Sequence, residues 1–279
     1  MNQTAVQKEV KDPSYLAGVA KNIRRSIVDL IFHAKSSHIG CSLSATDILA
    51  TLYFEVMNVD PKRPEDPDRD RFVLSKGHSV TALYSTLAEK GFFPKEALKS
   101  YGADGTPLAS HANLKVLPGM ENTAGSGGHG LSLGVGMAVA MRTDGRKNRI
   151  FVLSGDGELE EGSVWEALLF AGHHKLSNLT FIIDRNHFQD GADGQRTENI
   201  LDIDPLDEKL RAFHLDVTTV DGHDYAALKE ALTKASDKPR AVIAMTIKGK
   251  GVSFMEGKGE WHGKCPDEAQ YAQAMKELS

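Results

Sequence analysis

Two polar side chains that follow apolar runs are the strongest chemical signal in the sequence. Asp156 follows the run 149–154, and Asn186 follows the run 179–184. Because the ligands of parallel sheets bind beyond the carboxyl ends of the strands, we expect both side chains at one binding edge. Carboxylate and carboxamide oxygens suit Mg²⁺ or Ca²⁺, which often keep part of their coordination for a ligand phosphate. The pattern predicts a holder for a metal-bound diphosphate.

The glycines around Asp156 support this interpretation. Gly155 and Gly157 let the backbone approach a phosphate closely. A helix that begins after them would add free N–H groups and the positive end of its dipole. A Gly-Asp-Gly turn is common in proteins of any kind, so the metal interpretation depends on the apolar runs and on Asn186.

Apolar spacing along the chain alternates between the periods of helices and strands. Residues at three- and four-residue spacing over 16–31 predict a long amphipathic helix. A second helix is expected to begin near Ser44, with Asp47 three residues on in a capping-box arrangement. Further helices are expected at 81–90, 131–141, 164–174 and 224–234, and strands at 71–75, 149–154, 179–184, 216–220 and 241–247.

Glycines between 119 and 136 divide into two groups. Those at 125–130, Gly125 and Gly127 among them, predict a loop. Gly134 and Gly136 fall inside the helix expected next, where we expect them at close contacts.

Strands that alternate with helices imply crossover connections and a mainly parallel sheet. We therefore expect an α/β fold, doubly wound, with helices on both faces of the sheet. The sequence has no internal repeat and no low-complexity linker, so residues 1–279 are expected to form a single domain.

Composition argues against several classes of partner. The 279 residues are 41% hydrophobic and 25% charged, which is ordinary for a globular protein. A net charge of −5 leaves no basic surplus for nucleic acid. We expect no membrane segment, because no apolar run approaches the ~20 residues that span a bilayer, and residues 1–13 lack the apolar core of a signal peptide.

Cys41 and Cys265 have no metal-ligand spacing, so we expect reduced cysteines without a role and a cytoplasmic location.

The span from Gly155 through Asn186 resembles the thiamine diphosphate motif, and the surrounding sequence is similar to the transketolase family over nearly the whole chain. The matching segments are Ala34–His38, Ser42–Ala45, Arg71–His78, Leu117–Glu121, Val164–Ala167, Val220–His223, Lys248–Phe254 and Glu260–Gly263. So many matches in the same order are not a chance event. The resemblance implies a thiamine diphosphate-binding fold and transfer of a two-carbon ketol unit between sugar phosphates.

The resemblance also implies a ligand set. Asp156 and Asn186 would bind Mg²⁺ or Ca²⁺ through their side chains, and Phe188 through its carbonyl; the donor types do not choose between the two ions. The residues expected to bind thiamine diphosphate are His78, Gly125, Gly127, Gly155, Asp156, Gly157, Glu158, Asn186 and His262.

Four histidines are implied to line the channel to the reactive thiazolium carbon: His38, His78, His111 and His262. Imidazoles suit that task, because the reaction moves protons on and off sugar hydroxyls near neutral pH. Packing or surface roles are expected for His33, His173, His174, His187 and His214. His223 is expected to stabilise a loop, and His129 is left open between the two kinds of role.

Two acids, Glu161 and Glu166, match positions that in the family lie at the subunit interface and couple two active sites. Acids in a first helical turn are favoured by the dipole in any case, so this alternative stays open. Glu160 has the character of a dipole or solvent acid. Glu158 has the same character, although its place in the motif puts it with the cofactor residues.

Several positions depart from the family pattern around the channel. The family has Gly-His-Pro-Gly-Gly where this chain has Ser37-His38-Ile39-Gly40-Cys41. Gly127 and His129 replace other residues in the glycine loop, Ser110 and Ala112 flank His111, and the loop after Asn186 is longer. We expect these changes to alter the donor or acceptor sugar, such as a branched or otherwise modified ketose phosphate.

Transketolases also have a domain that binds the aminopyrimidine ring and supplies its activating glutamate. The sequence ends at Ser279, soon after the Glu260–Gly263 segment, so we expect the pyrimidine-binding and C-terminal domains on a separate partner chain, in an α2β2 heterotetramer. Alternatives are a subunit similar to deoxyxylulose phosphate synthase or to a 2-oxoacid dehydrogenase alpha chain, or a non-catalytic remnant that only binds cofactor.

Overall fold

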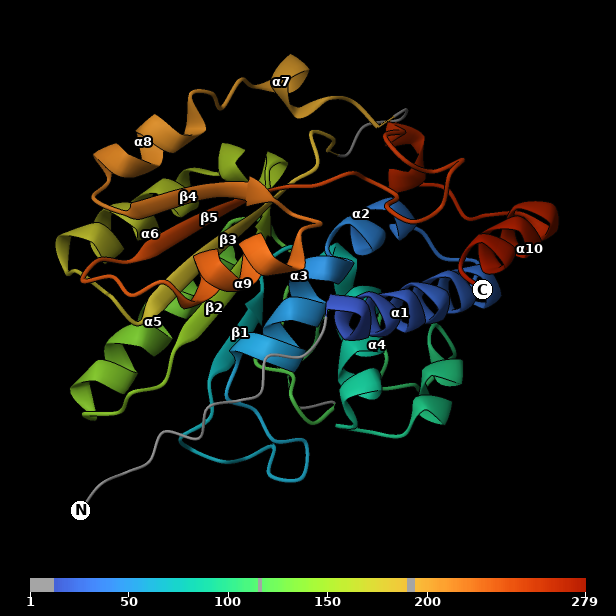
Figure 1. Ribbon diagram of the computed structural model, residues 1–279, viewed down its shortest axis with the longest axis horizontal. Helices are drawn as coiled ribbons and strands as arrows, with labels where there is room; N and C mark the ends of the chain where they lie inside the picture. Colours follow the sequence, from blue (N-terminus) through green and yellow to red (C-terminus); the bar gives the residue numbers. More distant parts are fainter. Residues whose placement is uncertain (1–12, 115–116, 190–193) are drawn as a thin grey trace.

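A parallel sheet of five strands forms the centre of the molecule in the computed structural model, which describes residues 13–114, 117–189 and 194–279 (Figure 1). The strand order is β1-β2-β3-β5-β4. The strands are β1 (Arg71–Leu74), β2 (Ile150–Gly155), β3 (Leu179–Arg185), β4 (Asp216–Asp221) and β5 (Arg240–Met245). Strand β3 is buried at every residue, as expected for a central parallel strand covered on both faces. Strand β4 lies at the edge, and Val217 is the one residue of this strand that is buried.

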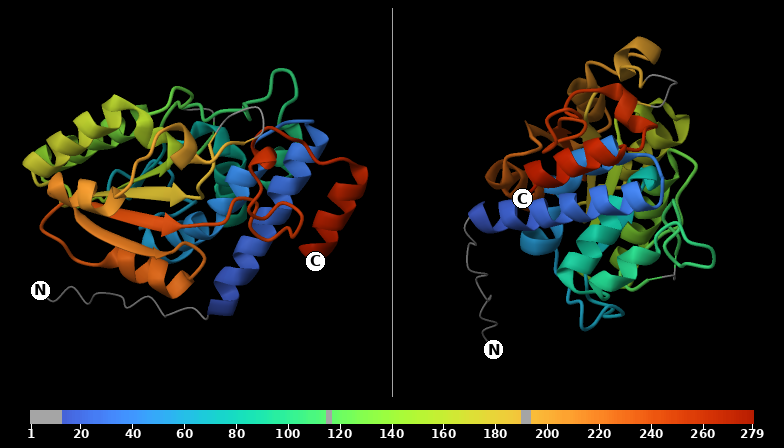
Figure 2. Two further views of the ribbon diagram at one scale, coloured as in Figure 1. Left: turned by 90° about the horizontal axis from the view of Figure 1, so that it is seen from above. Right: turned by 90° about the vertical axis from the view of Figure 1, so that its right-hand side faces the viewer.

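Helices cover both faces of the sheet. One face packs on α1 (Pro13–His33), α3 (Thr46–Thr51), α4 (Val80–Lys90) and α9 (Tyr225–Thr233), and the other on α5 (His129–Thr143), α6 (Gly162–His173) and α8 (Leu206–Ala212). Successive residues of β2 divide between the two cores: Phe151 and Leu153 face the first, Ile150 and Val152 the second. The layers are visible in the left view of Figure 2. The doubly wound α/β fold is confirmed.

The remaining elements are short or peripheral. Helix α10 (Glu268–Glu277) lies beside α1, where Arg25 donates to the carbonyl of Leu278 at 3.1 Å (Figure 2). The others are α2 (Ile39–Ser44), a π-helical turn (Leu52–Val56), α7 (Thr197–Ile200), and 3₁₀ turns at Gly77–Ser79, Lys95–Ser100, Gly157–Glu160 and Gly259–His262. Among the described residues, no helix is long and apolar enough to cross a membrane.

The expected capping box at Ser44 and Asp47 is wrong. Ser44 is the last residue of α2, and its hydroxyl donates to Asp184 at 2.6 Å. Asp47 lies inside α3 and binds Arg24 at 2.6 Å, together with two further side chains. Both side chains have buried tertiary partners, which a local capping pattern does not reveal.

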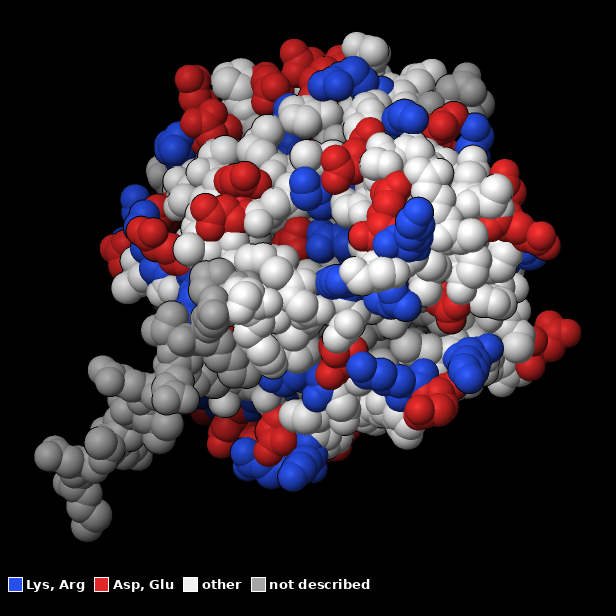
Figure 3. All heavy atoms as spheres, turned by 45° about the vertical axis from the view of Figure 1, so that its right-hand side comes forward, with Lys and Arg blue, Asp and Glu red and all other residues white. Residues whose placement is uncertain are grey.

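Both signs of charge are mixed on the surface. On the face shown in Figure 3, Lys and Arg side chains alternate with Asp and Glu. This pattern is ordinary for a solvated surface. The expectation that nucleic acid is not a partner stays a prediction.

Helix α5 packs closely on β2 through a glycine. A Cβ at Gly134 would lie 2.3 Å from Val152 Cγ2, whereas nothing lies within 4 Å of a Cβ at Gly136. The expectation of a close contact is confirmed for Gly134. It is wrong for Gly136, which lies on the exposed side of the helix.

Alanine at these two positions should therefore have opposite effects. Gly134→Ala forces a methyl group against Val152 and should lower the free energy of unfolding by about 1–3 kcal/mol. Gly136→Ala meets no atom and removes a helix-interior glycine, so it should be neutral or stabilising by up to ~1 kcal/mol. Urea unfolding of the two purified variants checks this, and equal destabilisation by both would contradict the packing.

Candidate active site

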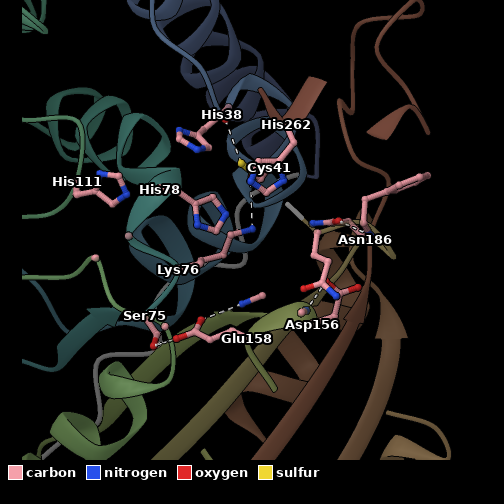
Figure 4. A pocket seen from close by; sticks show the side chains of 17 residues that line it. His38, Cys41, Ser75, Lys76, His78, His111, Asp156, Glu158, Asn186 and His262 are labelled. Atoms are coloured by element: carbon pink, nitrogen blue, oxygen red, sulfur yellow. Dashed lines mark hydrogen bonds between the residues drawn. The ribbon is translucent and has the colours of Figure 1, made fainter. Parts of the chain in front are cut away.

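A pocket of about 300 Å³ opens at the carboxyl edge of β1, β2 and β3 (Figure 4). This is the edge where parallel α/β sheets bind ligands. Its lining consists of His38, Cys41, Ser75, Lys76, Gly77, His78, His111, Gly125, Gly127, Gly155, Asp156, Gly157, Glu158, Asn186, Phe188, Gln189 and His262. All the residues expected to bind metal or cofactor are in this set. Of the six expected catalytic residues, the four histidines are in it, and Glu161 and Glu166 are not.

Asp156 directly follows β2 and is buried, with 1% of its surface exposed. Its carboxylate accepts hydrogen bonds from the backbone N–H groups of Gly157 at 3.0 Å and His187 at 2.7 Å. Burial raises the pKa of Asp156 to about 6, and the nearby Asp184 adds to the rise. A buried carboxylate with this elevated pKa is stabilised in its charged form by a cation.

Asn186 and Phe188 lie beyond the end of β3 and line the pocket, where Asn186 is on the same side as Asp156 (Figure 4). Asn186 Oδ1 accepts from the N–H of Phe188 at 3.1 Å, and its amide group lies 3.4 Å from Asp184. The carboxylate, the carboxamide and the Phe188 carbonyl offer oxygen atoms only. This donor chemistry fits a hard cation such as Mg²⁺ or Ca²⁺.

Asp184 is a buried anchor that the sequence analysis did not identify. Its carboxylate forms an ion pair with Lys76, accepts from Ser44 at 2.6 Å, and accepts from Thr246. Burial alone would raise the pKa of Asp184, but the Lys76 ammonium and the hydrogen bonds hold it below its usual range. Lys76 also donates to the Cys41 carbonyl at 3.3 Å, so the pair joins the loop after β1 to α2 and β3.

The channel histidines form a cluster (Figure 4). The ring centroids of His38, His78 and His262 lie 5.2–5.4 Å from one another, and His111 lies 6.1 Å from His38. The four histidines come from separate segments. His38 precedes α2, His78 and His262 lie in two different 3₁₀ turns, and His111 lies in a loop. The predicted grouping of these residues is therefore present in the fold.

Two of these rings are held neutral. Burial lowers the pKa of His78 to about 3 and that of His262 to about 2, and the charges of Lys76 and Lys248 add to both shifts. A neutral imidazole has one nitrogen that donates and one that accepts. Near pH 7 each of these side chains can therefore donate one hydrogen bond and accept another at a bound hydroxyl.

Lys248 was also missed by the sequence analysis, although it begins a segment that resembles the family. Its side chain is fully buried, and Nζ lies 3.0 Å from His262 Nδ1 and 3.5 Å from the Phe188 carbonyl. Burial lowers the pKa of this lysine. Lys248 thus connects the predicted metal ligands to the histidine cluster.

Glu158 organises the glycine loop. Its carboxylate accepts from the Gly128 N–H at 2.8 Å, from Ser154 at 2.6 Å and from the Ser75 hydroxyl. The interpretation as a solvent acid is therefore wrong for Glu158. Glu160 likewise accepts from the Gln189 amide at 2.5 Å. Apart from Ser154, these partners lie 29 to 83 residues away in the sequence, so the contacts could not be seen in it.

Glu161 and Glu166 lie outside the pocket, exposed at the start of α6. The exposed apolar residues Leu133, Leu169 and Phe170 belong to α5 and the same helix. An interface role for the two acids stays a prediction.

The remaining histidines are placed largely as expected. His223 Nε2 accepts a hydrogen bond from the backbone N–H of Ile247 at 2.9 Å, and its Nδ1 lies 2.7 Å from the Asp47 carboxylate. This histidine therefore stabilises a loop, as expected. His129 is exposed at the start of α5. Part of the longer loop after Asn186, residues 190–193, lies outside the described residues.

The α/β fold and the oxygen-lined pocket at the carboxyl edge of its sheet are those of a diphosphate-binding domain. Comparison with known proteins identifies the family to which this domain belongs. Residues 17–279 match the family model for the thiamine diphosphate binding domain of transketolase. The chain belongs to the transketolase family.

Relatives of similar length are named as subunits. The chain is 41% identical to an apulose-4-phosphate transketolase subunit of Phocaeicola vulgatus, over 92% of this chain and 91% of the relative. It is 42% identical to a 6-deoxy-6-sulfo-D-fructose transketolase subunit of a Clostridium species, over 93% and 94%.

Solved transketolases are longer. The structure of the Campylobacter jejuni transketolase superposes with a TM-score of 0.89 at 30% identity, covering 96% of this chain but 43% of that one. The chain thus spans about two fifths of the length of the solved transketolases that it matches.

The neutral histidines should make stability depend on pH. Because the folded pKa values of His78 and His262 lie below the unfolded value of about 6.5, the unfolded chain binds more protons at acidic pH. The free energy of unfolding should therefore fall as the pH drops below about 6.5 and should not depend on these groups above it. Asp156, with its pKa raised to about 6, opposes this trend between about pH 6 and 4.

His78→Gln should reduce the acid sensitivity. Between pH 7 and 5 it should lose roughly 1 kcal/mol less stability than the wild type, a figure discounted for solvent access to the pocket. Urea unfolding at both pH values, without metal or cofactor, measures this. His173→Gln, on the exposed end of α6, is the matched control. The same pH dependence in both variants would show that His78 is not held neutral.

Proposed function

We propose that this chain is the diphosphate-binding subunit of a split transketolase, which transfers a two-carbon ketol unit from a ketose phosphate to an aldose or aldose phosphate. The observation that carries the proposal is the oxygen-only group of Asp156, Asn186 and the Phe188 carbonyl beside a cluster of four histidines. Family membership supplies the reaction type. The names of two similar proteins as transketolase subunits support the division into chains.

In this proposal, Asp156, Asn186 and the Phe188 carbonyl hold Mg²⁺ or Ca²⁺. These three ligands would leave further coordination positions of the ion for diphosphate oxygens. Gly125, Gly127, Gly155 and Gly157 allow close approach of the backbone, while Glu158 keeps the glycine loop in place. Thiamine diphosphate, when bound, supplies the carbanion chemistry.

The histidines supply proton transfer and orientation. His38, His78 and His262 enclose one side of the pocket, with His111 farther out. These imidazoles would hold sugar hydroxyls and pass protons at the oxygen atoms that change charge. Lys248 beside His262 Nδ1 orients that imidazole.

The partner chain would complete the site. We propose that residues 1–279 form the one diphosphate-binding domain, and that a second chain provides the pyrimidine-binding domain in an α2β2 assembly. The exposed apolar residues of α5 and α6, with Glu161 and Glu166, are the surface proposed to meet it. Two free cysteines are in keeping with a reducing, cytoplasmic location.

The sugar is proposed to be a non-standard one. Ile39 and Cys41, which depart from the family pattern, lie beside His38, and Cys41 and Gly127 line the pocket. Similar proteins are named for apulose 4-phosphate and for 6-deoxy-6-sulfo-D-fructose, which are branched or modified sugars. A branched or otherwise modified ketose is therefore the substrate class to test.

The isolated chain should transfer ketol units at least ~10²-fold more slowly than the mixture with its partner, because half of the groups that position the reactants are missing. The native complex, purified through a tag on this chain, is assayed against a panel of ketose donors and against pyruvate. Robust transfer by the chain alone would contradict the split enzyme. Decarboxylation of pyruvate without ketol transfer would favour another thiamine diphosphate enzyme, and inactivity of the complex on every donor would favour a non-catalytic remnant.

Asp156→Ala should abolish metal-dependent binding of thiamine diphosphate to the complex while the fold survives, since it removes a carboxylate ligand rather than core packing. Calorimetry with and without Mg²⁺ measures the binding, and circular dichroism checks the fold. Asp237→Ala, at an exposed position away from the pocket, is the control. Unchanged affinity of the Asp156 variant at saturating Mg²⁺ would refute the metal role.

A further inference from the structure

One wall of the pocket carries a thiol next to two imidazoles. The sulfur of Cys41 and one ring nitrogen each of His78 and His262 all lie within 4.8 Å of one another. Cys41 is 1% exposed and His262 is 6% exposed, whereas His78 faces the cavity. Nothing in the proposed ketol transfer uses the thiol.

This donor set differs in kind from the oxygen ligands near Asp156. Sulfur and imidazole nitrogen suit Zn²⁺, which forms tetrahedral sites with bonds of about 2.3 Å to sulfur and about 2.0–2.1 Å to nitrogen. Such bonds place the ligand atoms roughly 3.5 Å apart. Side-chain rotations that move the sulfur and the two nitrogen atoms by about 1 Å would therefore bring them to bonding distance from one ion. Three protein ligands leave the fourth position to water, as in open zinc sites.

The charges around the group are partly balanced. Lys76 and Lys248 both lie near it and disfavour an added cation, but Lys76 is paired with Asp184. The thiolate that forms on binding contributes a further negative charge. Both imidazoles are already neutral and need not lose a proton.

We propose that Cys41, His78 and His262 form a Zn²⁺ site, and that Zn²⁺ bound there and thiamine diphosphate exclude each other. On binding, the S–H bond of Cys41 breaks, its proton goes to solvent, and a sulfur–zinc bond forms. The exclusion rests on the proposed function together with the expectation that His78 and His262 bind thiamine diphosphate. The metal site itself does not depend on that assignment.

Cobalt(II) is the probe for the site, because its spectrum reports the ligands. The full chain, reduced and freed of metal, is titrated with Co²⁺. We expect the visible bands of a tetrahedral ion and a sulfur-to-cobalt charge-transfer band in the near ultraviolet, both of which disappear when Zn²⁺ is added. Cys41→Ser should lose the charge-transfer band and bind Co²⁺ more than about tenfold more weakly, since even the loss of an outer-shell partner costs that much. Cys265→Ser, which changes the second free cysteine, should keep both bands.

A charge-transfer band that survives Cys41→Ser, or that is lost in Cys265→Ser, would overturn the site, as would the absence of tetrahedral bands in the wild type. If Cys41→Ser does not fold by circular dichroism, alkylation of the wild type replaces it. Zn²⁺ should then protect Cys41 and not Cys265, and equal protection or none would refute the proposal.

The exclusion has its own measurement. Adding thiamine diphosphate with Mg²⁺ to the cobalt-loaded native complex should remove the tetrahedral bands. Bands that persist while the cofactor is bound would overturn the exclusion. Because these spectra do not measure turnover, a failure of ketol transfer in the sugar panel is a separate result.

Discussion

The ion pair between Lys76 and Asp184 is the interaction on which the pocket depends. Its two side chains are 1% and 0% exposed, so each charge relies on the other and on the hydroxyls of Ser44 and Thr246. Removing one partner of such a pair costs roughly 3–5 kcal/mol, because the other charge stays buried. The four residues belong to four segments that are far apart in the sequence, and these segments also carry Cys41, His78 and Asn186. The Asp184 carboxylate thus fixes the positions of the segments that line the pocket, without any bound ligand.

Most of the fold could be predicted because the sheet imposes periodicity on the sequence. The central strands are continuous apolar runs, and α1 has a clear helical repeat. Short helices could not be predicted in this way, because α2 has 6 residues and α8 has 7. Each makes about two turns, which is too few for a helical repeat of apolar residues to be recognised. Helix α10 did have a usable signal in the capping box of Asp267 and Gln270. At Ser44 the same kind of signal was misleading, because a buried partner 140 residues away takes the side chain.

The candidate site was predictable only in part, for a related reason. Asp156 and Asn186 follow recognisable apolar runs, and the histidines lie in segments that resemble a known family. The charges that support them were missed. Lysine is almost never fully buried unless paired, so Lys76 and Lys248 could not be distinguished from surface lysines until the strand ends were brought together. The proximity of Cys41 to two imidazoles is likewise a property of the fold and not of sequence spacing.

We propose that this chain holds the metal and the diphosphate, and that a second chain completes the site. The most direct test is a crystal structure of the native complex with Mg²⁺ and thiamine diphosphate. We predict a metal ion bound by Asp156, by Asn186 Oδ1 and by the Phe188 carbonyl, with the diphosphate beside Gly157 and the pyrimidine ring held by the partner chain. A diphosphate bound elsewhere, or a cofactor enclosed by this chain alone, would contradict the account.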